Sequence, residues 1–164
     1  MRALSELTDV PLHLVLVEPE IPPNTGNVAR LCAATGCALH LVEPLGFSID
    51  DRALKRAGLD YWHMLDVVLY PNLTAFLEQT AARRRWFFSA HATRTYTDAA
   101  FTYGDMLVFG RETLGLEKDL VARYAESALR IPMRPRSVRS INLSTAVGIA
   151  AYGALARLDF PGLR

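Results

Sequence analysis

The stretch that decides the fold is Leu12–Val42, which reads LHLVLVEPEIPPNTGNVARLCAATGCALHLV. Its first part, Leu12–Val17, has the length and the apolar content of a buried strand. The strand cannot continue through Glu18–Pro23, because three prolines remove hydrogen-bond donors and restrict φ. A second apolar run, Ala38–Val42, has the composition of another buried strand. Two such strands on either side of a helix indicate a parallel sheet.

The helix between these strands is predicted from its ends and its spacing. Asn24 or Thr25 can cap its N-terminus, and Gly36 can end it. Its apolar residues follow the three-to-four spacing of a helix and are Val28, Leu31 and Cys32.

The same alternation continues to the C-terminus. We predict further strands at Val67–Tyr70, Trp86–Ala90, Met106–Phe109 and Ala128–Ile131. We predict further helices from Asp50 or Asp51 to Gly58, from Asn72 to about Ala82, over Glu117–Tyr124 and over Ile141–Leu158. The expected fold is a single α/β domain, residues 1–164, with a mostly parallel sheet of about six strands and helices on both faces. The sequence does not decide whether residues 1–10 form a disordered extension of it.

Composition excludes several classes of protein. The 164 residues are 51% hydrophobic, with 18 basic and 17 acidic side chains, which suits one folded domain and excludes global disorder. No apolar run reaches the roughly 18 residues of a membrane span, and no secretory signal is visible, so we expect a cytoplasmic protein. Cys32 and Cys37 are expected to be buried thiols, and the four histidines are scattered, so no metal site is predicted.

Arginine supplies most of the positive charge, since only two of the 18 basic residues are lysine. After Glu126 there are six basic residues and one acidic residue, a balance of +5, whereas the part up to Glu126 has a balance of −4. One cluster is Arg83, Arg84, Arg85 and Arg94, and the other is Arg130, Arg134, Arg136 and Arg139. Both suit a phosphate-binding surface, although charge alone favours an ordinary, arginine-rich solvated face.

The last predicted helix contains Thr145–Ala156, a stretch with no charge and with small residues on every side. A helix that is apolar all round must be covered all round. One face can pack on the sheet and another on a second subunit, which predicts a homodimer. The alternative is a helix wholly buried in its own domain.

Three loops follow predicted strands and are rich in Gly, Pro, Asn or Ser: Glu18–Arg30, Phe109–Leu116 and Ile131–Ser144. Ligands of open α/β sheets bind beyond the carboxyl ends of the strands, where these loops lie. The loops lack the glycine fingerprint of dinucleotide-binding folds, the phosphate loop of nucleotide hydrolases and the nucleophile elbow of α/β-hydrolases.

In these loops the sequence resembles the SPOUT superfamily of trefoil-knot RNA methyltransferases, and within it the TrmL-type tRNA (cytidine/uridine-2′-O)-methyltransferases. The matching stretches are Leu14–Trp62, FGRETLGL (Phe109–Leu116), IPM (Ile131–Met133) and SINLSTAVGIAAY (Ser140–Tyr152). The resemblance implies methyl transfer from S-adenosyl-L-methionine to the 2′-hydroxyl of the wobble pyrimidine, C or U at nucleotide 34, in leucine tRNAs. It also implies a C-terminal knot and a homodimer with each active site at the subunit interface.

The resemblance assigns roles position by position. Arg30 is the expected catalytic residue; because a guanidinium is a poor base, we expect it to align the hydroxyl and stabilise the developing oxyanion, while the adjacent phosphate helps to take the proton. Glu112 either orders its own loop or caps a helix. The expected RNA-binding residues are Asn24, Asn27, Arg139 and Asn142, and the alternative for Asn142 is a plain helix cap. The expected cofactor-binding residues are Phe88, Gly110, Ile131, Met133, Ser140 and Leu143.

The sequence departs from the family pattern in two places. Arg111 stands where proline is expected, and the segment RPRSVR before Ser140 is one residue longer than usual. Two alternatives to the wobble assignment stay open: the same reaction on another tRNA position or on ribosomal RNA, and a catalytically silent RNA-binding dimer.

Overall fold

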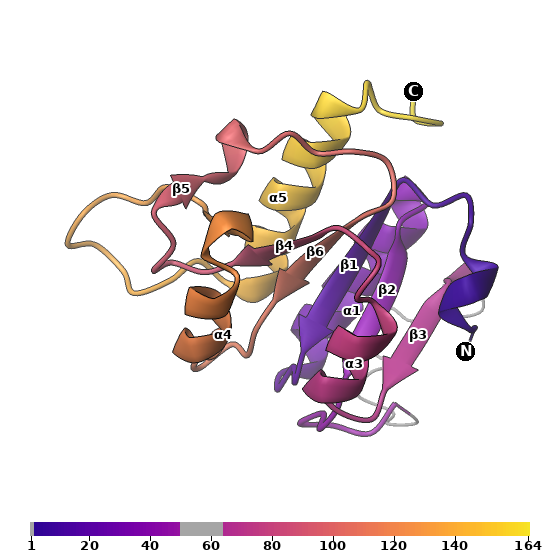
Figure 1. Cartoon of the computed structure of the whole chain (residues 1–164), viewed down its shortest axis with the longest axis horizontal. Helices are drawn as coiled ribbons and strands as arrows, with labels where there is room; N and C mark the ends of the chain where they lie inside the picture. The colour runs from indigo at the N-terminus through magenta and orange to yellow at the C-terminus, as the bar shows by residue number, and fades with distance from the viewer. Residues whose placement is uncertain (1, 50–63) are drawn as a thin grey trace.

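The computed structural model describes residues 2–49 and 64–164 (Figure 1). In this part of the chain, a parallel sheet of seven strands has the order β3-β2-β1-β6-β4-β7-β5. The strands are β1 (Leu12–Val17), β2 (Ala38–Val42), β3 (Val67–Tyr70), β4 (Arg85–Phe88), β5 (Arg94–Thr95), β6 (Asp105–Phe109) and β7 (Ala128–Arg130).

Helices cover both faces of this sheet, as predicted (Figure 1). The helices are α1 (Pro22–Thr35), α3 (Leu73–Gln79), α4 (Lys118–Arg123) and α5 (Leu143–Arg157), with short 3-10 turns at η1 (Leu4–Glu6), η3 (Tyr96–Asp98) and η4 (Ala125–Ser127). Helices α1 and α5 share one hydrophobic core with Leu14 and Leu16 of β1. Helices α3 and α4 share the other core with Val15 and Val17, because alternate side chains of a strand point to opposite faces.

The six predicted strands are all present, and three of them have the predicted bounds. Strand β5 was missed, because Arg94–Thr95 lies in a stretch that has the composition of a polar loop. Only pairing with β7, from Arg94 opposite Leu129 to Thr95 opposite Arg130, makes these two residues a strand. The helix predicted from Asp50 or Asp51 to Gly58 lies outside the described residues.

Helix α1 begins earlier than predicted. Ile21 is its N-cap and Pro22 its first residue, so the prediction of Asn24 or Thr25 as the cap was wrong. Proline suits the first helical position because its fixed φ is helical and it has no N–H to satisfy there. The predicted end is confirmed, since Gly36 has a left-handed φ of 71°.

The residues that precede Pro11 contact the sheet. Leu7 and Val10 are buried in the core that α3 and α4 share. The backbone N–H of Arg2 donates to the carbonyl of Val67 at 2.9 Å, and its guanidinium pairs with Asp66.

Two buried histidines form a hydrogen-bonded row across β1, β2 and β3. Arg83 Nη1 lies 3.3 Å from His13 Nε2, His13 Nδ1 lies 2.8 Å from His40 Nε2, and His40 Nδ1 lies 3.0 Å from the hydroxyl of Tyr70. Because arginine can only donate, His13 Nε2 accepts, and each following Nδ1–H then donates along the row. Both rings are therefore neutral, and burial lowers the pKa of His13 to about 4 and that of His40 well below its usual value.

This row predicts a loss of stability in acid. An unfolded histidine has a pKa of about 6.5, so below that pH the unfolded chain takes up protons that the folded protein excludes; His13 alone then contributes a loss of about 2 kcal/mol at pH 5. The free energy of unfolding, measured by urea titration from pH 7.5 to pH 5, is expected to fall less steeply in His13→Gln than in the wild type. His91→Gln, which removes an exposed histidine, is the control and should keep the wild-type slope. Equal slopes in all three proteins would contradict this account.

Candidate functional site

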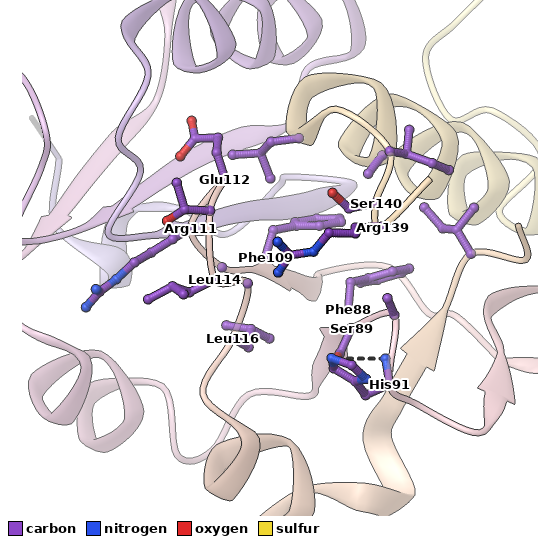
Figure 2. Close-up of a pocket in the computed structure, with 18 of the residues that line it drawn as sticks. Phe88, Ser89, His91, Phe109, Arg111, Glu112, Leu114, Leu116, Arg139 and Ser140 are labelled. Carbon is purple, nitrogen blue, oxygen red and sulfur yellow. Dashed lines mark hydrogen bonds between the residues drawn. The ribbon is translucent and has the colours of Figure 1, made fainter. Parts of the chain in front are cut away.

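A cavity of about 340 Å³ lies at the carboxyl ends of the central strands (Figure 2). Strands β1, β6, β4 and β7 are neighbours in the sheet, so the loops that follow them meet at one edge. Three of these loops and the start of α5 form the walls, with Phe88–His91, Phe109–Leu116, Ile131, Met133, Arg139–Ile141, Leu143 and Ala146 as lining residues. The three glycine-, proline- or asparagine-rich loops of the sequence are thus brought together, two of them as walls of the cavity.

The cavity combines an aromatic surface with a few polar groups. Phe88 and Phe109 stack with ring centroids 4.7 Å apart and planes at 17°. Figure 2 shows these two rings and the side chains of Arg139 and Ser140 around the same space. A small-molecule site of this size is typically apolar, with a few polar groups that set the ligand's orientation.

The loop between β6 and α4, residues 110–117, requires glycine at two positions, and we call it the glycine loop. A Cβ atom on Gly110 would lie 2.1 Å from the carbonyl carbon of Gly115, so no other residue fits there without moving the backbone. Gly115 has a left-handed φ of 68°, and its N–H donates to the carbonyl of Arg111 at 2.9 Å. The loop therefore folds back on itself and presents backbone groups to the cavity.

Three consecutive side chains tie this loop to the segment before α1. Arg111 pairs with Glu18. The carboxylate of Glu112 accepts from the backbone N–H groups of Glu20 at 2.7 Å and Ile21 at 3.1 Å. The N–H and hydroxyl of Thr113 donate in return to the carboxylate of Glu20.

Both alternatives for Glu112 hold in this one geometry. Its carboxylate holds its own loop, and it also satisfies N–H groups at the start of α1, where a negative charge is favourable. The N–H groups that it accepts from belong to the N-cap residue and to the residue before it, and the first turn of α1 has no acidic side chain of its own. Arg111, the departure from the family pattern, contributes an ion pair to the same contact between the loops.

Two asparagines extend the contact to the third loop. Asn24 donates to Glu112 Oε1 at 3.1 Å and accepts from the side chain of Asn142 at 3.0 Å. Asn142 accepts in turn from the backbone N–H of Thr145 at 3.3 Å, as the N-cap of α5. Asn142 is therefore a helix cap and a member of this row at once, which joins the starts of α1 and α5 to the glycine loop.

The structure separates the predicted site residues into two groups. All six predicted cofactor residues line the cavity, and so does Arg139, which was assigned to RNA. Arg30 and Asn27 lie three residues apart on α1, are exposed, and do not line the cavity. Lining residues that were not predicted include Ser89 and His91; the signal for them was their place at the end of the predicted strand Trp86–Ala90 and directly after it.

Neither cysteine belongs to the site. Cys32 and Cys37 are buried free thiols, as predicted, and burial raises the pKa of Cys37 to about 11 and that of Cys32 well above its usual value. Within the described residues, no three histidine, cysteine or acidic side chains form a group that could hold a metal ion. No helix in the same residues is long and apolar enough to cross a membrane.

The fold and the site define a class of RNA-modifying enzyme. A methyltransferase solved in complex with AdoMet, AviRb from Streptomyces viridochromogenes, has the same fold with a TM-score of 0.80 at 21% identity, over 96% of this chain and 65% of that one. Residues 11–152 match the SpoU rRNA Methylase family, to which this chain belongs.

Relatives with a particular activity match over nearly their whole length. The tRNA (cytidine(34)-2′-O)-methyltransferase of Saccharophagus degradans is 49% identical, over 92% of this chain and 97% of the relative. The protein of the same name from Escherichia coli K12 is 47% identical, over 92% and 96%. A structure solved to explain 2′-OH methylation of C/U34 on tRNA is 50% identical, with a TM-score of 0.85 over 90% of this chain and 96% of that one.

The contact made by Glu112 predicts a defect in cofactor binding. Glu112→Ala removes three hydrogen bonds to a carboxylate, so the loop loses one of the three side chains that tie it to the segment before α1. We expect S-adenosylmethionine, measured by isothermal titration calorimetry, to bind about tenfold more weakly, since one hydrogen bond to a charged group contributes about 1.5 kcal/mol. Glu117→Ala, an exposed carboxylate next to the same loop, is the control and should bind normally. Unchanged affinity in Glu112→Ala would contradict the anchoring role.

Proposed function

We propose that this protein is a cytoplasmic, homodimeric methyltransferase that methylates the 2′-hydroxyl of the wobble pyrimidine, C or U at nucleotide 34, in leucine tRNAs. The observation that carries the proposal is the cavity, which gathers all six residues that the family pattern assigns to the cofactor. The relatives support the substrate, since proteins named for cytidine 34 of tRNA are nearly half identical to this chain from end to end.

The cavity fits S-adenosyl-L-methionine. Its volume is in the range of small-molecule sites, and the loop from Gly110 to Gly115 presents backbone groups that can hold an adenosine. Gly110, Ile131 and Leu143 would hold the cofactor through their backbones, with Ser140 adding a hydroxyl. When bound, the cofactor supplies a methyl group on a sulfonium centre, which is electrophilic enough to need no metal.

The role of Arg30 follows from its charge and its place. A guanidinium stays protonated at neutral pH, so Arg30 cannot serve as the general base. It can align the 2′-hydroxyl and stabilise the oxyanion that develops on it, while the neighbouring phosphate of the RNA helps to take the proton. Asn27, three residues before it on α1, is on the same side for contacts with the nucleotide. Glu112 and Asn24 hold the start of this helix against the cavity wall.

The proposed dimer, with its trefoil knot and interfacial active sites, has separate support. Arg30 does not line the cavity of its own chain. Helix α5 carries the exposed Tyr152, next to Phe160, with ring centroids 6.4 Å apart. A second subunit that covers this apolar surface would also supply Arg30 to its neighbour's cavity. After β7 the chain leads back to the middle of the sheet, where α5 packs on β1 and β6. This path is compatible with the knot.

Methyl transfer tests the proposed reaction directly. Methyl-labelled S-adenosylmethionine and total tRNA from cells that lack the gene are incubated with the wild type, Arg30→Lys or Arg30→Ala, and nucleosides are identified by mass spectrometry. We expect label in 2′-O-methylcytidine or 2′-O-methyluridine, with a rate about 100-fold lower in Arg30→Ala, as for loss of an oxyanion donor. Label on a base, on 2′-O-methylguanosine or nowhere would contradict the wobble assignment, and near-full activity of Arg30→Ala would remove Arg30 from the mechanism.

Mixing two inactive variants tests the shared active site. Arg30→Ala leaves the cavity intact, whereas Ser140→Trp fills the cavity and leaves Arg30 intact. If Arg30 serves the partner's cavity, each mixed dimer regains one complete site, and an equal mixture should recover about one quarter of wild-type activity after subunit exchange. No recovery, in a mixture shown by mass spectrometry to contain mixed dimers, would place Arg30 and the cavity in one subunit.

A further inference from the structure

The structure distinguishes the two arginine clusters of the sequence. In the first cluster, every guanidinium has a partner within the protein. Arg84 lies 4.8 Å from the ring centroid of Trp86 and donates to the carbonyl of Ala100. Arg94 also lies over Trp86, 5.5 Å from its ring centroid, and donates to the carbonyl of Asp98.

The other two members of that cluster are also engaged. Arg83 contacts His13, and Arg85 donates to the carbonyl of Leu77 at the end of α3 and to the hydroxyl of Thr80. These four arginines therefore stabilise the fold, and the interpretation of this cluster as a phosphate-binding surface is not supported by its contacts.

The second cluster has a different environment. Arg134, Arg136 and Arg139 are exposed, in a segment between β7 and α5 that contains no acidic residue. Across residues 2–49 and 64–164, no hydrogen bond or ion pair engages their guanidinium groups. Three exposed guanidinium groups within six residues, with no hydrogen bond or ion pair in the described part of the chain, leave their planar donors available to an anion.

The backbone of this segment is shaped in a way that favours binding. Pro135 restricts its own φ, Arg136 has a left-handed φ of 57°, and the hydroxyl of Ser137 donates to the carbonyl of Arg134 at 2.6 Å. A non-glycine residue at such a φ is strained by about 1 kcal/mol or more, and strain of this kind clusters at ligand-binding sites. A turn that is already formed also lowers the entropy that binding must overcome.

The segment lies beside the cavity. Ile131 and Arg139, near its two ends, both line the cavity. The loop between β7 and α5 projects away from the sheet in Figure 1. A nucleotide that is methylated at the cavity has a phosphate on either side of its ribose. The RNA backbone on one side of that nucleotide would thus pass next to Arg134 and Arg136.

We propose that Arg134 and Arg136 form a phosphate-binding rim that holds the RNA backbone flanking the methylated nucleotide. The rim rests on the proposed function, since RNA is the anion that it would bind. Contacts with phosphates position the RNA and carry affinity without reading its bases. Guanidinium groups suit this role because their planar donors match phosphate oxygens. The longer RPRSVR segment is then an extension of the RNA-binding surface.

The salt dependence of RNA binding tests the rim. Arg134→Ala/Arg136→Ala is compared with the wild type for binding of unmodified substrate tRNA by fluorescence anisotropy from 50 to 300 mM KCl. Each phosphate contact contributes about 0.7 to 0.9 to the slope of log Kd against log salt, so we expect the slope to fall by about 1.5. In methyl transfer, KM for tRNA should rise, while kcat and the Kd for S-adenosylmethionine stay unchanged. Arg139 is left intact because it lines the cavity.

Two controls make the result specific. Arg134→Lys/Arg136→Lys keeps both charges and should retain most of the wild-type slope. Arg164→Ala removes an exposed arginine at the C-terminus, on the other side of the molecule in Figure 1, and should leave the slope unchanged. The proposed rim would be contradicted by an unchanged slope in the double alanine variant or by an equal fall of the slope in Arg164→Ala. Loss of S-adenosylmethionine binding in the double alanine variant would contradict it as well. A wild-type protein that methylates no RNA would contradict the proposed function itself, whereas an active wild type with an unaffected double variant contradicts only the rim.

Discussion

The carboxylate of Glu112 joins parts of the chain that are about 90 residues apart, and the site depends on it. It accepts hydrogen bonds from the backbone of Glu20 and Ile21 and from the side chain of Asn24, whose own oxygen accepts from Asn142. One charged group thereby accepts from backbone N–H groups at the start of α1 and holds the glycine loop beside them. Through Asn24 it is also linked to Asn142 at the start of α5. A helix that carries the proposed catalytic Arg30 and a loop that forms the cavity wall are held in one arrangement by the same atoms.

This arrangement explains why the fold tolerates irregular backbone at one edge of its sheet. Loops rich in glycine and proline have little tendency of their own toward one conformation, and ordering them costs conformational entropy. Here the Arg111–Glu18 pair, the Thr113–Glu20 contact and the Asn24–Asn142 contact hold them together. The sheet supplies the rigid part, since its central strands β1, β2 and β6 are buried on both faces. The site thus combines a rigid sheet with loops that hold one another.

Arginine serves two purposes in this protein, and the difference lies in the surroundings of each side chain. Arg84 and Arg94 lie over Trp86 of β4 and donate to the carbonyl groups of Ala100 and Asp98, so they hold that segment of the chain against the sheet. Arg134 and Arg136 project from a turn without a neighbouring carboxylate. The same residue type, in two clusters of similar density in the sequence, therefore contributes to folding in one place and to substrate binding, as proposed, in the other.

The sequence alone determined the elements whose signals are local. The bounds of β1, β2 and β3, the end of α1 at Gly36 and the Asn72 cap of α3 follow from apolar runs, glycine and capping residues. The family pattern, also visible in the sequence, named six residues that the structure brings to one cavity. Only the tertiary structure decided the strand β5, the neutral His13–His40 pair and the contact of Arg83 with His13. Each of these depends on a partner far away in the chain, such as β7 for β5 or His40 for His13, and no local pattern specifies which distant groups will meet.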